Sequence, residues 1–304
     1  MASQRDVKNK IASVKNIQKI TRAMEMVAAA RLRRAEQRIA VLRPYADAIG
    51  RMTRQAAKAA GSEVDRVPLL REHESQTSVA LLLVTGDRGL AGGFNSQIIR
   101  AGLRLSGEIA EEGLRSSWYA TGRRGVSSLA FRGHELEGSY SGFADRPSYA
   151  DARTIADDLI QAYADDRVDR VEMVYNSYIS PLTQHVTLQT LLPLTHRSVA
   201  GEHDEPLDTA QDGAAAPPRV TVEYEPDAEQ ILMRLVPDYI EVSIYRALVE
   251  SAAGFFGAQM TAMRSASENA GEIITDYTLQ MNRARQAEIT QEIMEVVAGA
   301  EGLS

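Results

Sequence analysis

Helical patterning occupies both ends of this 304-residue chain. The first proline is Pro44, and from Gln4 to about Ala60 apolar residues recur at steps of three and four, the spacing of a narrow helical stripe. At 1.5 Å per residue, roughly 55 residues make a rod of roughly 80 Å. No compact domain of this size needs such a rod, so the pattern predicts a helix that pairs lengthwise with another.

The predicted N-terminal stripe has two stretches. An extra step of three near Ile17 predicts a local shift of the stripe around the helix. The stripe residues are Val7, Ile11, Val14, Ile17, Ile20, Met24 and Val27, then Ala28, Leu32, Ala35, Ile39, Leu42, Ala46 and Ile49.

A short strand at 220–224 and a helix at 227–235 are expected to lead into a second long helix at the C-terminus. No proline follows Pro237, and Asp238 is a residue type that caps helix starts, so the helix is predicted to begin there. Many stripe residues are alanine, which permits close helix–helix approach. The stripe residues are Ile240, Ile244, Leu248, Ala252, Phe255, Ala262, Ala266, Ala270, Ile273, Tyr277, Met281 and Ala284.

The two ends carry opposite charge. Residues 1–43 hold eleven Lys or Arg against three Asp or Glu, and residues 238–304 hold four Arg against ten Asp or Glu. Two helices of similar length and opposite charge predict an antiparallel coiled coil. A basic N-terminal arm is also compatible with an acidic protein partner or with nucleic acid.

The middle of the chain differs in kind. Apolar, strand-like runs at 79–84, 168–176 and 185–192 alternate with helical patterns near 96–112, 123–131 and 149–164, and a further short strand is expected near Trp118. This alternation predicts an α/β layer domain. The predicted organisation is a coiled-coil helix at 1–60, an α/β domain at 75–195, an acidic flexible loop at 196–219, and a C-terminal segment with the second long helix at 220–304.

Composition excludes several classes of site. There is no cysteine, so disulfides, thiolate catalysis and zinc–thiolate sites are impossible. The five histidines show no metal-ligand spacing, and no run of 18 apolar residues spans a bilayer. The polar N-terminus lacks the apolar core of a secretory signal, which predicts that the chain stays on the cytoplasmic side.

A glycine-rich loop, Thr85–Asn95 (TGDRGLAGGFN), follows a predicted strand and precedes a helix. Such loops can cradle phosphate through backbone N–H groups. The spacing fits neither GxGxxG nor GxxxxGK[ST], and no lysine follows. A structural turn between strand and helix is therefore favoured over a phosphate site.

Charged clusters on the predicted rods have ordinary explanations. The glutamates Glu288, Glu292 and Glu295 recur at helical spacing, which favours an exposed charged face over an acid–base pair. The arginines between Arg31 and Arg38 lack interleaved aromatic residues, so an acidic protein surface is favoured over nucleic acid. No set of nucleophile, base and orienting residue emerges, so no catalytic, cofactor or metal site is predicted.

Several segments, in order, resemble the gamma subunits of F-type (bacterial) ATP synthases. The segment Lys10–Arg38 (KIASVKNIQKITRAMEMVAAARLRRAEQR) resembles the N-terminal helix of that family. Gly86–Asn95 resembles its DRGLCGG segment, with Ala91 in place of the usual cysteine. Ala262–Ala270 (AMRSASENA) and Asn282–Ala300 (NRARQAEITQEIMEVVAGA) resemble its C-terminal segments. The resemblance covers essentially the whole chain.

The resemblance implies a Rossmann-like α/β domain inserted between two terminal helices that form an antiparallel coiled coil. It implies a non-catalytic rotor shaft without a cofactor, which couples rotation of the membrane c-ring to ATP synthesis or hydrolysis and regulates ATPase activity and proton flow. The implied partners are the alpha and beta subunits of the catalytic hexamer, the epsilon subunit and the c-ring. Nucleic acid is not among them, and the implied location is the cytoplasmic side of the cell membrane.

The resemblance also implies residues for subunit contact. Met24 occupies the helix position that faces the acidic loops of the beta subunits, and Arg285, Gln286, Thr290 and Glu292 match positions that hydrogen-bond beta-subunit loops. The alternatives to a rotor are a stand-alone coiled-coil scaffold or an α/β phosphate-binding protein.

Overall fold

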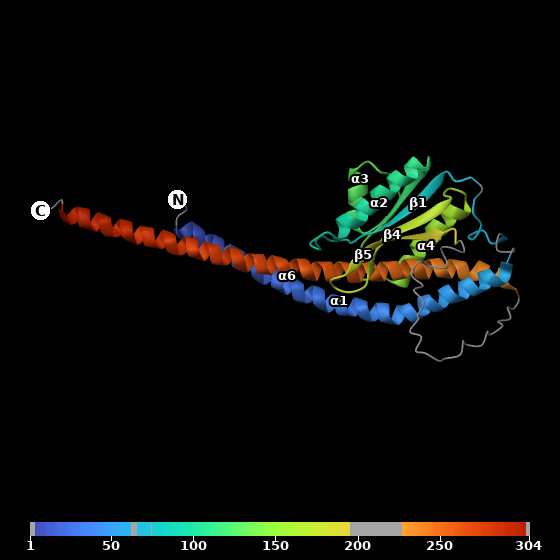
Figure 1. Ribbon diagram of the computed structural model, residues 1–304, viewed down its shortest axis with the longest axis horizontal. Helices are drawn as coiled ribbons and strands as arrows, with labels where there is room; N and C mark the ends of the chain where they lie inside the picture. The colour runs from blue at the N-terminus through green and yellow to red at the C-terminus, as the bar shows by residue number, and fades with distance from the viewer. Residues whose placement is uncertain (1–3, 62–65, 74, 195–226, 302–304) are drawn as a thin grey trace, which may run out of the picture. The chain divides into compact units, whose positions relative to one another are not determined.

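The computed structural model describes residues 4–61, 66–73, 75–194 and 227–301 (Figure 1). Helix α1 (Gln4–Ala60) and helix α6 (Ala228–Glu301) hold the two ends of the chain. The chain divides into a terminal unit, Met1–Ala30 with Gln259–Ser304, and a central unit, Arg31–Ala258, and both long helices contribute to each. None of the described helices is both long enough and apolar enough to cross a membrane.

In the terminal unit α1 and α6 run antiparallel, as predicted. Lys10 lies over the Tyr277 ring at 5.8 Å, and the Gln18 side chain donates to the Ser267 carbonyl at 3.2 Å. Arg264 Nε donates to Glu25 Oε1 at 2.9 Å. As residue numbers rise along α1, those of the partners on α6 fall, which defines the antiparallel pair. In the Arg264–Glu25 pair the acidic residue, Glu25, lies on the more basic helix, and Arg264 lies on the more acidic one. The net charges of the two helices therefore do not explain this contact.

The prediction of which residues form the buried stripe of α1 is wrong in the middle of the terminal unit. Ile17, Ile20 and Val27 are each more than half exposed. The inward positions instead keep an unbroken heptad spacing that passes through polar residues, so no shift of the stripe occurs. Ile273 on α6 is likewise exposed, whereas Ala270 is buried. The inward positions of α1 in this unit are Val7, Ile11, Val14, Gln18, Thr21, Glu25 and Ala28.

The central unit is built on a five-stranded sheet in the order β3-β2-β1-β4-β5. β1 pairs in parallel with β2 and β4, β2 pairs in parallel with β3, and β4 and β5 are antiparallel. This arrangement confirms the α/β class predicted from the sequence. The strands are β1 (Ser78–Val84), β2 (Arg115–Thr121), β3 (Leu136–Tyr140), β4 (Arg170–Tyr178) and β5 (Gln184–Leu192).

Helices cover both faces of this sheet (Figure 1). Every residue of β1 is buried, and its side chains alternate between the two faces. Ala80, Leu82 and Val84 join the core cluster that also contains residues of α4 (Tyr149–Ala164) and α6. The opposite face meets α2 (Phe94–Glu111), where Gly102 lets the helix backbone approach the Leu83 side chain. α3 (Arg123–Phe131) lies beside β2 and β3.

Strand β3 was not predicted from the sequence. It has five residues with a glycine, Gly138, at its centre, and glycine weakens the strand signal. A Cβ at Gly138 would lie 2.5 Å from the Tyr119 ring. The close approach of the two strands therefore requires glycine at position 138, although glycine has a low propensity for strands.

The helix predicted at 227–235 and the long helix predicted from Asp238 are one continuous helix, α6, which passes through Pro237. Asp227, rather than Asp238, caps it, because the Asp227 carboxylate accepts the Gln230 N–H at 2.7 Å. A proline inside a helix costs about 3 kcal/mol. Here Val236, directly before the proline, and Ile240, three residues after it, are fully buried, and that burial offsets the cost.

A buried acidic clasp joins the segment before β1 to the start of β4. The Asp169 carboxylate accepts the Thr77 and Ser78 N–H groups at 2.7 and 2.9 Å. It also lies 2.8 Å from His73 Nδ1, and the His73 ring stacks on Tyr163. Burial alone would raise the pKa of Asp169, but these hydrogen bonds outweigh it and hold the pKa below its usual value.

The acidic loop predicted at 196–219 and the short strand expected at 220–224 lie outside the described residues.

Gly122 supplies the first prediction. It has a φ of 81°, and a Cβ there would lie 2.2 Å from the Thr85 carbonyl oxygen. Gly122→Ala should lower the free energy of unfolding by about 2–4 kcal/mol through strain and overpacking. Gly107→Ala, in α2 with open space around it, is the control and should raise it by about 0.5–1 kcal/mol. Urea titration followed by the fluorescence of Trp118 measures both, and equal effects would contradict the geometry.

The second prediction concerns the pH dependence of the stability that Asp169 provides. Its folded-state pKa lies below the unfolded value, so its stabilisation is present at neutral pH and is lost as the pH falls through the folded-state pKa. Asp169→Asn should be less stable than the parent at neutral pH, with a smaller further loss below about pH 4. Denaturant titrations at several pH values measure this, and parallel pH profiles for the two proteins would refute it.

Candidate functional site

The edge of the sheet where parallel strands end is the usual ligand site of an open α/β fold. Strand order reverses between β1 and β4, because β2 and β3 lie on one side of β1 and β4 and β5 on the other. A crevice at such a switch point is where these folds bind ligands. The glycine-rich loop predicted from the sequence follows β1 at this edge.

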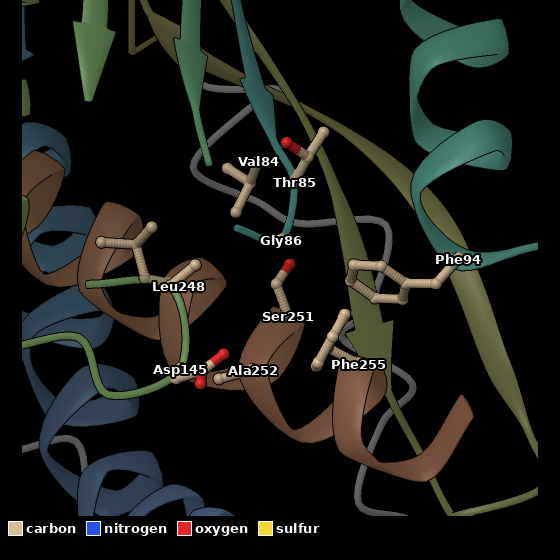
Figure 2. Close-up of a pocket in the computed structure, with 10 residues that line it drawn as sticks. Val84, Thr85, Gly86, Phe94, Asp145, Leu248, Ser251, Ala252 and Phe255 are labelled. Atoms are coloured by element: carbon tan, nitrogen blue, oxygen red, sulfur yellow. The ribbon is translucent and has the colours of Figure 1, made fainter. Parts of the chain in front are cut away.

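In this chain α6 fills that crevice. Figure 2 shows Ser251 directed toward Gly86, with Phe255 beside Phe94. The two phenyl rings meet edge to face with centroids 5.7 Å apart, and a Cβ on Gly86 would lie 2.9 Å from the Phe255 ring. The cavity that remains among these residues is about 10 Å³, at the lower limit for one water molecule. A nucleotide has no room there.

The glycine-rich loop is occupied by its own side chains. Asn95 accepts the Gly86 N–H at 2.8 Å and donates to the Arg88 carbonyl at 3.0 Å. The Asp87 carboxylate accepts the N–H of Arg123, at the start of α3, at 3.1 Å, and also those of Gly142 and Ala144. The Asp87 carboxylate thus already holds the N-terminus of α3, one of the helix ends at this edge that would attract an anion. This geometry favours the structural turn.

An acidic residue of the neighbouring loop ties this edge to α1. The Asp145 carboxylate accepts from Arg31 at 3.0 Å and lies 3.4 Å from an Arg88 nitrogen. The Arg31 guanidinium also lies 5.6 Å from the centre of the Phe256 ring. The crevice is therefore closed by packing and charge from α1, α6 and two loops. Among the described residues, no cluster of His, Asp and Glu has the arrangement of a metal site.

The contact residues expected from the sequence belong to the terminal unit. Met24 is half-buried on α1, and Arg285, Gln286, Thr290 and Glu292 are all exposed on α6. The Thr290 hydroxyl donates to the Gln286 carbonyl of its own helix at 2.8 Å. From Arg285 to Ala298 every side chain is exposed, including five large apolar ones. Those apolar residues are Ile289, Ile293, Met294, Val296 and Val297.

A helix end that exposes this much apolar surface needs a partner to cover it. Comparison with known proteins shows the family to which this chain belongs. A family model described as ATP synthase matches residues 3–303. The ATP synthase gamma chain of Rubrobacter xylanophilus is 42% identical over 304 residues, covering all of this chain and 99% of that one. The chain belongs to the ATP synthase gamma chain family.

Another relative agrees with this assignment, and two solved structures share the fold. The ATP synthase gamma chain of Nostoc punctiforme is 39% identical over 316 residues and covers both chains fully. A chain of the Euglena gracilis mitochondrial ATP synthase (OSCP/F1/c-ring, rotational state 3) has the same fold, with a TM-score of 0.67 at 16% identity over 99% of this chain and 94% of that one. A chain of the Tetrahymena thermophila central stalk/c-ring structure gives a TM-score of 0.56 at 24% identity over 82% and 99%.

Membership in the gamma chain family settles the class of function. A gamma chain is a non-catalytic subunit of ATP synthase, as the sequence predicted, and the family supports a rotor shaft over a stand-alone scaffold or a phosphate-binding protein. Sequence reasoning missed two buried polar residues of α6, namely Ser251, which lines the crevice, and Glu250, which contacts the end of β4. The available signal was their position inside a helical stretch that is otherwise almost wholly apolar.

The filled crevice gives the third prediction. Phe255→Ala should lower the free energy of unfolding by about 3–5 kcal/mol, since it empties the packing against Phe94. Phe131→Ala, at a side chain that is 90% exposed, should change it by less than about 0.5 kcal/mol.

The parent chain should show no ATP binding in isothermal titration calorimetry. Tight ATP binding by the isolated chain would contradict the filled crevice.

Proposed function

We propose that this chain is the central rotor shaft of a proton-translocating bacterial F-type ATP synthase. It couples rotation of a membrane c-ring to ATP synthesis or hydrolysis at the beta subunits, and it regulates ATPase activity and proton flow. The observation that carries the proposal is the exposed end of α6, residues 285–298, in a chain that belongs to the gamma chain family. This end of α6 offers surface for contact with other subunits.

The proposed partners are the alpha and beta subunits of the catalytic hexamer around the terminal unit. Exposed basic residues on α1 are suited to acidic loops of the beta subunits, and the apolar end of α6 is suited to an apolar sleeve. The basic residues of α1 that face outward in this unit are Arg5, Lys8, Lys10, Lys15, Lys19 and Arg22. The epsilon subunit and the c-ring are the proposed partners of the central unit, and the complex lies on the cytoplasmic side of the cell membrane.

The contact residues have distinct roles in this proposal. Arg285 and Glu292 are seven residues apart on α6 and therefore share a face, from which they form charge-assisted bonds that change as the shaft turns. Gln286 and Thr290 share the adjacent face and hydrogen-bond beta-subunit loops. Met24 keeps its position on α1 free of charge, since a cation there adds attraction to the acidic loops. Each angle of the shaft thus favours a different conformation of each beta subunit.

Reconstitution gives the fourth prediction. Mixed with alpha and beta subunits, the chain should form a stable complex and confer ATPase activity, measured by gel filtration and phosphate release. Arg285→Ala should lower that rate by about tenfold, which corresponds to one charge-assisted hydrogen bond of about 1.5 kcal/mol. Arg283→Ala, exposed on the same helix, is the control. A mixture that forms no complex and gains no activity would overturn the proposed function.

A further inference from the structure

Strand β4 extends beyond the end of its neighbour. β1 pairs with β4 from Val79 opposite Arg170 to Leu83 opposite Val174, and β4 then continues to Tyr178. In a strand, alternate N–H groups point to the same side. Past the end of β1, the N–H groups of Asn176 and Tyr178 have lost the strand to which they would donate. Because both residues are buried, each unpaired N–H would carry a free-energy cost.

Two successive residues of α6 replace the missing strand. Ser251 Oγ accepts the Asn176 N–H at 3.2 Å, and Glu250 Oε2 accepts the Tyr178 N–H at 3.4 Å. Glu250 Oε2 also accepts from the Ser177 hydroxyl at 3.0 Å. The carboxylate is 2% exposed, and its other oxygen accepts from Arg246 Nε at 2.8 Å. A helix is therefore hydrogen-bonded to the edge of a sheet through side chains that cap strand N–H groups.

Two glycines one turn further along α6 bring the helix into close contact with the β4–β5 hairpin. A Cβ on Gly254 would lie 2.6 Å from Asn176 Oδ1. A Cβ on Gly257 would lie 2.8 Å from Gln184 Nε2 and 3.3 Å from the Pro181 carbonyl oxygen. The spacing of residues 250, 251, 254 and 257 places them on one helical face. We call these four residues the strand seat of α6.

We propose that the strand seat holds α6 in one orientation about its own axis against the sheet, so that torque is transmitted between helix and sheet without slip. This proposal rests on the proposed rotor function. A helix held only by apolar packing can turn about its axis at modest cost, because such contacts are not directional. Hydrogen bonds to two fixed N–H groups two residues apart are directional. Turning α6 by one residue position would bury both donors without partners.

Further polar contacts extend the seat to α1. The Tyr178 hydroxyl donates to Glu36 at 2.6 Å, and Arg246 lies 3.9 Å from Asp47. Burial alone would lower the pKa of Arg246, but the Glu250 carboxylate outweighs it and raises that pKa. The arginine therefore stays charged. Both long helices of the central unit are thus linked to the end of β4.

The test separates anchoring to the strand from the ion pair. Glu250→Ala removes both, whereas Glu250→Gln keeps an oxygen that can accept from Ser177 and Tyr178 and loses the charge opposite Arg246. Ser251→Ala removes only the acceptor for Asn176. In the isolated chain, amide hydrogen exchange at Tyr178 in Glu250→Ala and at Asn176 in Ser251→Ala should be about tenfold faster, the change given by one hydrogen bond of about 1.4 kcal/mol. In Glu250→Gln the Tyr178 amide should stay protected.

The same variants are then assembled into the complete ATP synthase in vesicles. The complex with Glu250→Ala should hydrolyse ATP but pump fewer protons per ATP, whereas the complex with Glu250→Gln should keep the parent ratio. If Glu250→Ala does not assemble, Ser251→Ala should show a partial loss of protons pumped per ATP. Glu241→Gln is the matched control, because Glu241 is also buried on α6 but faces Arg153 of α4 at 3.8 Å. Normal pumping with exposed strand amides would overturn the proposal. A parent chain that assembles with no subunits would instead refute the rotor function.

Discussion

The burial of α6 on all sides is the constraint on which the central unit depends. From Ile240 to Gly257 only two side chains are not fully buried, so the helix contacts the sheet and α4 on one side and α1 on another. A helix enclosed in this way must satisfy every polar group that it carries, and Glu250 and Ser251 do so by capping a strand. The position that other α/β folds leave open for a ligand is thereby used for mechanical attachment.

Closing the crevice has a functional counterpart. A protein that binds nucleotide at its switch point must keep a cavity there, and such a cavity weakens packing at the centre of the fold. Here Phe94 and Phe255 fill it, while Asn95 pairs with the loop backbone and Asp87 binds backbone N–H groups of neighbouring segments. The chain therefore places rigidity where a related architecture would place chemistry, which suits a subunit whose role is to transmit force.

Much of this architecture could be predicted from the sequence, and the failures have physical causes. The bounds of α1 and α4 follow from periodicity, because a long or well-capped amphipathic helix gives a strong local signal. The predicted bounds of α3 also match, although this short helix has no side-chain N-cap. Periodicity does not predict which face of α1 is buried, because the apolar residues Ile17 and Ile20 point outward, whereas Gln18 and Thr21 point inward. Such choices depend on the partner helix. The strand seat is equally invisible, because it depends on where β1 stops relative to β4, a property of sheet register.

The polar inward positions of α1 have a consequence for sliding. Gln18 and Glu25 meet Ser267 and Arg264 only in the observed alignment of the two helices. Displacing one helix along the other by a heptad, about 10 Å, would restore apolar contacts but leave these partners mismatched. An all-apolar seam would pack almost equally well in several alignments. The terminal unit thus accepts a weaker seam in exchange for one defined alignment of its two helices.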